Sequence, residues 1–138
     1  MEHTDCVFCK IVAGEIPAQV VYEDDKTLAF LDVRPVNNGH TLVIPKNGSA
    51  TNIFDVTPED WAAVMETVRK VSNAIEKSLD ARGVNLMMNN REHAGQVVDH
   101  VHVHIIPRFV NDGLKLWPQH PYKEGEADVV AEKIRAEL

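Results

Sequence analysis

The chain has 138 residues, of which 44% are apolar and 25% are charged, and these values are ordinary for one domain with a buried core. We therefore predict a single domain over residues 1–138. The formal net charge of −7 argues against a nucleic-acid-binding protein, because such proteins present a basic surface to the phosphates.

The N-terminal residues predict the compartment and a first candidate site. Met1 to Asp5 lack the basic and apolar regions of a signal peptide, and no apolar run approaches the length of a membrane span. We therefore expect a cytoplasmic protein without membrane contact. Cys6 and Cys9 are the two cysteines. In a reducing compartment such a pair is more often metal-binding or redox-active than a structural disulfide.

The first third of the chain predicts a short helix and three strands. A helix is expected over residues 8–13, a hairpin over residues 20–33 and a further strand over residues 40–46. Asp32 lies at the end of an apolar strand. It is either a ligand contact or a turn aspartate, and the local sequence favours neither.

A long helix follows in the middle of the chain. Thr57 and Pro58 are a capping hydroxyl and a proline for the first helical position, and two acidic residues come next. Apolar residues at helical spacing then form one stripe, which predicts a face buried in the core. We expect this helix to end near Arg82 and Gly83, with glycine as the stop.

The last third predicts two strands and a terminal helix. Residues 84–89 read as a strand, and the polar loop over residues 90–95 returns the chain to a histidine-rich strand. Two strands joined in this way are most simply antiparallel neighbours. Residues 109–123 are irregular, and residues 126–138 show a weak helical stripe.

The histidine-rich strand has the most informative spacing in the chain. His100, His102 and His104 alternate with valines and precede Ile105. Alternation of this kind predicts three imidazoles on one face of a strand and aliphatic residues facing the core. Pro107 cannot donate a backbone hydrogen bond and suggests where regular pairing ends. The spacing leaves a solvated polar face, a metal site and nucleophilic catalysis all open.

The chain resembles the histidine triad (HIT) family of nucleotide hydrolases and transferases, in its Hint-like bacterial branch. The signature of alternating histidines fits residues 100–106 in full, and Ala94-Gly95-Gln96 precedes it at the expected distance. Three further stretches match the same branch: Cys6 to Pro17, Leu28 to Asp32, and Gly39 to Lys46. The resemblance thus covers most of residues 6–108.

The resemblance implies both a fold and a reaction. The fold is α+β, an antiparallel sheet of about five strands with one long helix and short terminal helices, and family members pair as homodimers. His102 would attack the α-phosphorus of a nucleoside phosphate conjugate and form a covalent nucleotidyl-histidine. His104 would assist the phosphate or the leaving group, while His100 and His40 would fix the geometry. Catalysis by this route requires no cofactor.

The resemblance also implies the contacts to a purine nucleotide conjugate. Asp32 would accept from the ribose hydroxyls. The base pocket would be formed by Phe8, Ile16, Phe30 and Val33. The phosphate and the leaving group would be approached by Asn89, Gly95 and Gln96. Many members carry Ser or Thr where this chain has Val97, so the backbone N–H of Val97 would replace a hydroxyl donor.

A structural zinc ion is a further expectation from the resemblance. Bacterial relatives often bind zinc through a Cys-x-x-Cys pair, a histidine soon after Ile-Pro-Lys-x, and the first triad histidine. Cys6, Cys9 and His100 supply three such ligands, but Gly48 stands where the fourth is expected, and a closed structural site has four. Two other functions remain open: a zinc-dependent hydrolase, and a nucleotide-binding regulatory protein with vestigial turnover.

Overall fold

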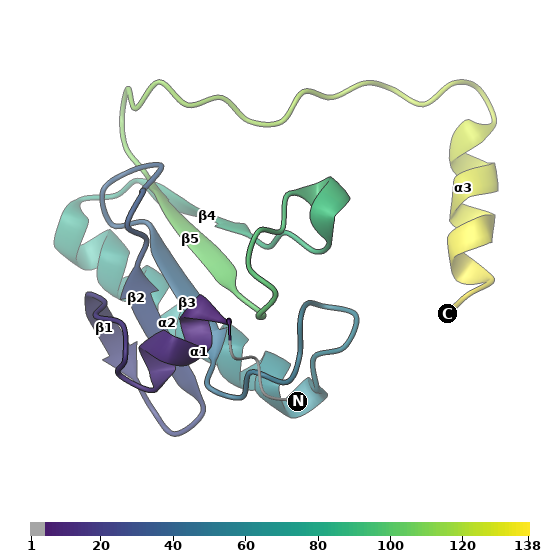
Figure 1. The fold of residues 1–138 in the computed structure, drawn as a ribbon. Coiled ribbons are helices and arrows are strands. Elements are labelled where there is room, and N and C mark those ends of the chain that lie inside the picture. The colour runs from purple at the N-terminus through teal and green to yellow at the C-terminus, as the bar shows by residue number, and fades with distance from the viewer. Residues whose placement is uncertain (1–4) are drawn as a thin grey trace.

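The computed structural model describes residues 5–138 as a five-stranded antiparallel sheet with helices on its faces (Figure 1). The predicted α+β fold, with one long helix and short terminal helices, is confirmed. The expectation drawn from Met1 to Thr4 lies outside the described residues. The elements in chain order are α1 (Val7–Val12), β1 (Val20–Glu23), β2 (Thr27–Leu31), β3 (Thr41–Pro45), α2 (Pro58–Leu79), β4 (Gly83–Met87), the 3-10 helix η1 (Glu92–Ala94), β5 (Val103–Arg108) and α3 (Glu126–Arg135).

The sheet has the strand order β1-β2-β3-β5-β4, and all neighbouring pairs are antiparallel. The predicted pairing of the strand after the long helix with the histidine strand is therefore confirmed. His104 pairs with Leu42 of β3 on one side and with Met87 of β4 on the other. The histidine strand is thus internal to the sheet, and β4 forms one edge.

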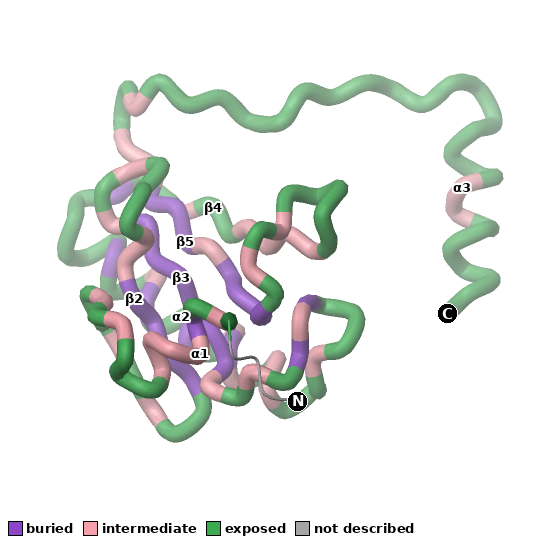
Figure 2. The backbone as a smooth tube through the Cα atoms, in the orientation of Figure 1, coloured by how far each residue is buried: buried purple, intermediate pink, exposed green. Residues whose placement is uncertain are grey.

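Two apolar clusters cover the two faces of the sheet. Because successive side chains of a strand point to opposite faces, neighbours in one strand belong to different clusters. Ala29, Val43, Val103 and Ile105 join the buried side chains of α2. Leu28, Phe30, Leu42 and Ile44 join Phe8 of α1. The buried segments in Figure 2 accordingly run through β2, β3 and β5. His104, between Val103 and Ile105, faces the α1 side, away from the α2 core.

The long helix begins as the sequence predicts and ends differently. Thr57 Oγ1 accepts from the backbone N–H of Asp60 at 3.2 Å, and Pro58 opens the helix. At the C-terminus, Asp80 adopts the left-handed conformation with φ 56°. The predicted glycine stop is wrong, because Gly83 already begins β4. Aspartate can serve here since its short polar side chain tolerates the left-handed region.

The histidine strand is shorter at its start and longer at its end than predicted. Regular pairing begins at Val103, so His100 and His102 precede β5. Pro107 does not end the strand, because it pairs with Val84 and β5 continues to Arg108. On the β3 side pairing reaches only as far as Ile105, and the Pro107 carbonyl accepts from Asn37 Nδ2 at 2.8 Å.

The C-terminal segment leaves the body of the molecule after β5. An extended stretch carries α3 away from the sheet (Figure 1), and Val129 and Ile134 of its predicted apolar stripe are exposed. The stretch is anchored at its start by Arg108, whose guanidinium contacts Asp112 at 2.8 Å. Within residues 5–138, no helix combines the length and apolar character that a membrane span requires.

Candidate active site

The backbone fixes the orientation of the His102 ring. Its Nδ1 lies 2.7 Å from the carbonyl oxygen of His100. Because a carbonyl only accepts, Nδ1 must carry the proton and donate it. In the neutral imidazole the other nitrogen, Nε2, then keeps its lone pair. His102 is only 6% exposed, so the ring is held in place and presents Nε2 as a nucleophile or a metal ligand.

A second pair of imidazoles is ordered by a chain of hydrogen bonds. The backbone N–H of Val36 donates to His40 Nδ1 at 3.0 Å, which leaves the proton of His40 on Nε2. His40 Nε2 lies 2.9 Å from His104 Nδ1 and donates to it. The proton of His104 is therefore on its Nε2. The rings of His104 and His102 have centroids 5.1 Å apart, so an N–H donor lies beside the His102 lone pair.

Burial keeps these imidazoles neutral. It lowers the pKa of His40 and of His102 below their ordinary value, although the charge of Asp32 acts in the opposite direction on both. Burial, together with the neighbouring His102 and His40, lowers the pKa of His104 to about 4 against the opposing charge of Asp32. Uncharged rings at neutral pH are what nucleophilic attack by imidazole and donation by a neutral N–H require.

Asp32 serves the turn and the imidazole cluster together. Its Oδ1 accepts from the backbone N–H of Arg34 at 2.8 Å, which is the bond of a turn aspartate. Its Oδ2 lies 3.7 Å from His40 Nε2. The carboxylate is half-buried, so one oxygen keeps free lone pairs next to the cluster. The two readings that the sequence left open are thus compatible in one side chain.

The residues expected to form a base pocket lie in two environments. Phe8 and Phe30 are buried with ring centroids 5.5 Å apart, and the Phe8 ring also packs edge-on against His102 at 5.1 Å. Ile16 is half-buried, and Val33 is 92% exposed. Phe8 therefore packs against the His102 ring, while Val33 presents an apolar surface to solvent beside Asp32.

The loop before the histidine strand is fixed mainly by the side chain of Gln96. Its Nε2 donates to the carbonyls of Thr51 and Val98 at 2.7 and 3.0 Å, and its Oε1 accepts from the backbone N–H of Arg91 at 2.7 Å. Gln96 thus shapes the loop with both ends of its amide. Within the same loop Asn89 Nδ2 donates to the Gly95 carbonyl at 3.3 Å. Val97 is 92% exposed.

Sequence reasoning missed two kinds of supporting residue. Val36 orients His40 through its backbone N–H, which no side-chain pattern can reveal. Buried Asn52 donates to Gln96 Oε1 at 3.4 Å and helps fix the loop. A buried asparagine is unusual. The surrounding sequence is an irregular loop, however, and it has no periodic pattern from which the burial of Asn52 could be predicted.

The cysteine pair lies against the first triad histidine. Cys6 Sγ and Cys9 Sγ are 3.3 and 3.4 Å from His100 Nδ1. The three ligand atoms lie within 4.8 Å of one another and form a group that could hold a metal ion. A second such group consists of Asp32, His40 and His104.

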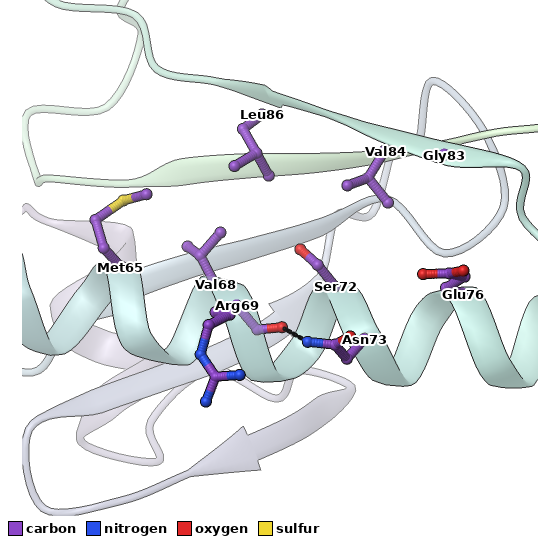
Figure 3. Close-up of a pocket in the computed structure, with 9 residues that line it drawn as sticks. All are labelled: Met65, Val68, Arg69, Ser72, Asn73, Glu76, Gly83, Val84 and Leu86. Atoms are coloured by element: carbon purple, nitrogen blue, oxygen red, sulfur yellow. Dashed lines mark hydrogen bonds between the residues drawn. The ribbon is translucent and has the colours of Figure 1, made fainter.

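Two cavities on the α2 side of the sheet lie away from the imidazoles. One, of about 290 Å³, is a groove between α2 and β4 lined by residues such as Met65, Val84 and Leu86 (Figure 3). Another, of about 410 Å³, lies between α2 and the strands β1 to β3. Both open on the α2 side of the sheet, whereas the imidazoles face the α1 side, so we assign neither cavity to the histidine chemistry.

Comparison with known proteins agrees with this geometry. The HIT domain family model matches residues 13–111. A relative from Bacillus subtilis, named protein hit, is 42% identical over 138 residues and covers 97% of this chain and 94% of its own length. A Schizosaccharomyces pombe protein named adenosine 5'-monophosphoramidase is 39% identical, covering 96% of this chain and 98% of its own.

The fold comparison is equally extensive. A crystal structure of a protein from Streptococcus mutans superposes with a TM-score of 0.92 at 42% sequence identity. The match covers 99% of this chain and 87% of the other. The similarity therefore includes nearly the whole chain.

Proposed function

Because the chain belongs to the HIT domain family, we propose that it is a nucleotide hydrolase or transferase that works through a covalent nucleotidyl-histidine. The proposed reaction occurs at the α-phosphate of nucleoside phosphate conjugates, with purine nucleosides preferred. Phosphoramidates, aminoacyl adenylates and dinucleoside polyphosphates are the substrate classes. The name of the S. pombe relative, an adenosine 5'-monophosphoramidase, supports this reaction class.

One observation carries the proposal: the two ends of the His102 ring have different roles. The His100 carbonyl holds the Nδ1 proton, and this leaves a lone pair on Nε2 of a neutral, buried ring. A histidine on a solvated polar face would not have this fixed orientation. Phosphoryl transfer asks mainly for positioning and charge stabilisation, which a fixed ring and a neighbouring N–H provide.

The chemistry follows from the proton positions. His102 Nε2 attacks the α-phosphorus, and the bond from phosphorus to the leaving group breaks with its electron pair on the leaving atom. That atom takes its proton from a solvent water, while the neutral His104 Nε2–H donates a hydrogen bond to the leaving atom or a phosphoryl oxygen and the bond from His40 to His104 Nδ1 supports the ring. His102 carries a positive charge in the nucleotidyl intermediate, and its Nδ1 proton stays hydrogen-bonded to the His100 carbonyl. Water then attacks phosphorus, gives up a proton to the solvent and releases neutral His102 with the nucleoside monophosphate.

The remaining contacts of the substrate follow the family pattern. We propose that Asp32 accepts from the ribose through its free lone pairs and that Val33 and Ile16 contact the base beside Phe8 and Phe30. Asn89, Gly95 and the Val97 N–H would approach the phosphate. Gln96 would act through the loop shape, because both ends of its amide are already bonded.

The zinc-hydrolase alternative has one observation in its favour. Asp32, His40 and His104 offer three ligand atoms in one group. However, the facing nitrogens of His40 and His104 are only 2.9 Å apart and share a proton, so a metal ion would have to break that bond. Turnover that persists after dialysis against a chelator is expected, and turnover lost on chelation and restored by zinc would favour this alternative.

The proposal is tested by whether His102 becomes covalently modified during the reaction. Wild-type protein, quenched during reaction with an adenosine phosphoramidate, should carry one adenylyl group on His102 by intact-protein mass spectrometry and peptide mapping. His102→Ala should lose both the adduct and turnover while still binding nucleotide. His104→Ala should keep a detectable adduct with turnover slower by about 10²–10⁴-fold, as for loss of an assisting group.

The exposed His120 supplies a matched control, because His120→Ala removes an imidazole far along the C-terminal segment. It should leave the adduct and the turnover unchanged. An adduct on His100 or His104, or near-normal turnover by His102→Ala, would contradict the assignment of His102 as the nucleophile. Nucleotide binding without any adduct in wild-type protein would favour the regulatory alternative.

A further inference from the structure

The cavity of about 410 Å³ between α2 and the strands β1 to β3 has the size and the lining of a small-molecule site. Such sites usually measure about 300–1,000 Å³ and are mostly apolar, with a few polar groups that orient the ligand. Leu31 of β2 lines the sheet side of this cavity, while Val71, Ile75 and Leu79 of α2 line the helix side. A ligand in it would therefore bury an apolar body between the helix and the sheet.

A β-bulge adds two neighbouring side chains of β1 to the same wall. Successive side chains of a regular strand point to opposite faces, yet Val21 and Tyr22 both line the cavity. Val20 pairs with Phe30 whereas Tyr22 pairs with Ala29, so Val21 is an extra residue in β1. Bulges redirect side chains in this way and are frequent beside functional sites.

Gly39 allows α2 to close one end of the cavity. Its φ is 92°, a value that favours glycine, and a Cβ placed on it would lie 2.5 Å from Leu79 Cδ1. Gly39 directly precedes His40, and Leu31 directly precedes Asp32. The backbone N–H of Asp32 donates to the His40 carbonyl at 2.9 Å, so this wall is fixed by the fold itself.

Lys70 is the one charged side chain among the described residues that line the cavity. Its Nζ donates to Tyr22 Oη at 3.4 Å and lies 5.5 Å from the centre of the Tyr22 ring. Nearby carboxylates are engaged elsewhere: Glu66 pairs with Arg69 at 2.7 Å, and Asp24 accepts from Tyr22 Oη and from the turn between β1 and β2. Within residues 5–138 Lys70 forms no ion pair, so its ammonium group is available to an external anion.

The groove between α2 and β4 lacks this charge pattern. Both Arg69 and Glu76 line it (Figure 3), and Arg69 is already paired with Glu66. An anion gains no unpaired cation there. Of these two cavities, only the one beside Lys70 combines an apolar interior with a single positive charge at its edge.

We propose that the cavity beside Lys70 binds a small free monocarboxylate with an apolar body, such as a medium-chain fatty acid. The carboxylate contacts Lys70 Nζ, and the alkyl chain lies against Leu31, Val71 and Ile75. Because Lys70 is exposed, the carboxylate keeps part of its hydration, and burial of the chain supplies most of the affinity. The proposal is independent of the reaction assigned to His102, because the imidazoles face the other side of the sheet.

Calorimetric titration of the full-length protein with hexanoate, octanoate and octan-1-ol tests the ligand class. We expect one octanoate per chain, with an affinity that increases by up to about fourfold for each buried methylene added to hexanoate. Lys70→Met keeps an unbranched side chain without the charge. It should weaken octanoate binding about two- to fivefold, the effect of an exposed ion pair, and leave octan-1-ol binding unchanged. Lys133→Met, the same change at an exposed lysine of α3, should alter neither.

Two further measurements test the location. In backbone amide NMR spectra octanoate should shift the signals of Leu31, Gly39 and Ala74, and it should leave those of Gly83 and Leu86 in the other groove unchanged. Ala74→Trp fills the cavity from an exposed position of α2 and should abolish binding of both octanoate and octan-1-ol.

Four results would overturn the proposal. Octanoate that fails to saturate, or that binds Lys70→Met as tightly as wild-type protein, would exclude a carboxylate site at Lys70. Shifts at Gly83 and Leu86 in place of Leu31 and Gly39 would assign the binding to the other groove. An affinity that falls as the protein concentration rises would assign the cavity to a second copy of the chain.

Discussion

At the scale of single residues, Asp32 combines a turn contact with an approach to His40. One oxygen closes a turn on the Arg34 N–H, and the other lies 3.7 Å from His40 Nε2. An effect of mutating Asp32 therefore contains a turn contribution and a ligand contribution. The two contributions can be separated by comparing a ribonucleotide with a 2'-deoxynucleotide, because the turn contribution is the same for both sugars.

We predict that Asp32→Ala weakens binding of a ribonucleotide more than that of its 2'-deoxy counterpart. The difference should be about 1–3 kcal/mol, the range for a charge-assisted hydrogen bond. Calorimetric titration with both nucleotides measures it. Asp32→Asn is the matched control, because its amide oxygen can keep the turn bond while the charge is lost. Equal losses for both sugars would assign Asp32 to the turn alone.

The protonation of the histidines predicts how activity depends on pH. Burial lowers the pKa of His102, and that of His104 falls to about 4, so both rings stay neutral below the ordinary histidine value of about 6.5. Turnover should be level around neutral pH and fall on the acid side with a midpoint below about 6.5. A rate profile across this range measures it, and an acid midpoint above the ordinary histidine value would contradict it.

The same shifts predict a pH dependence of stability. The unfolded chain binds protons on these histidines near pH 6.5, whereas the folded chain binds them only at lower pH. The free energy of unfolding should therefore increase as the pH rises from the lowered pKa values of the folded chain to about 6.5. It should decrease as the pH falls through the same range. Denaturant titrations at several pH values test this, and His104→Gln should flatten the dependence because it removes the group with a pKa of about 4.

At the scale of secondary-structure elements, α2 depends on its first turn. Thr57 Oγ1 caps the N–H of Asp60, and Pro58 begins the helix. The sequence predicts this end well because capping involves residues three apart. The other end depends on where the chain must turn to enter β4, and there Asp80 takes the left-handed conformation.

We predict that Thr57→Ala lowers the free energy of unfolding by about 1 kcal/mol, the usual cost of removing an N-cap hydroxyl. Thr57→Ser keeps the hydroxyl oxygen and should lose only a small part of this free energy of unfolding. Denaturant titrations of the three proteins give the comparison. Nucleotidyl transfer should not change, because α2 lies across the sheet from the imidazoles, and a parallel loss of activity would contradict that separation.

At the scale of the whole molecule, the outer α2–β4 face and the C-terminal segment are left largely exposed by the rest of residues 5–138. β4 is an edge strand with Leu86 49% exposed, and the groove in Figure 3 lies beside it. Ser72 Oγ in that groove is buried without a hydrogen-bond partner within residues 5–138. An unpaired edge beside apolar surface favours association with another chain.

We predict that the protein is a homodimer whose subunits meet at this face. Leu86→Arg should shift the wild-type dimer toward monomer in sedimentation equilibrium, because it places a charge in the apolar contact. Val21→Arg, at the opposite edge strand and similarly exposed, is the matched control and should leave the dimer intact. A wild-type monomer at micromolar concentration, or an equal effect of both changes, would contradict this interface.

Local sequence determined the elements and the face on which the imidazoles lie. The alternation from His100 to Ile105, the capping pair Thr57-Pro58 and the antiparallel pairing of β4 with the histidine strand all depend on segments close in sequence. Backbone geometry translates these patterns directly into structure, with a period of two residues in strands and 3.6 in helices. The helices, the strands and the row of histidines could therefore be predicted from these patterns, whereas the α+β fold was implied by the resemblance to the family.

Only the tertiary structure decided how each histidine is oriented and which nitrogen carries its proton. The proton positions on His40, His102 and His104 are set by the Val36 N–H, the His100 carbonyl and the bond between His40 and His104. The approach of Gly48 to Cys9 is likewise decided by packing between distant segments. Such contacts depend on how separate segments meet, and a hydrogen bond or a coordination position exists only when both partners are placed to within a few tenths of an ångström.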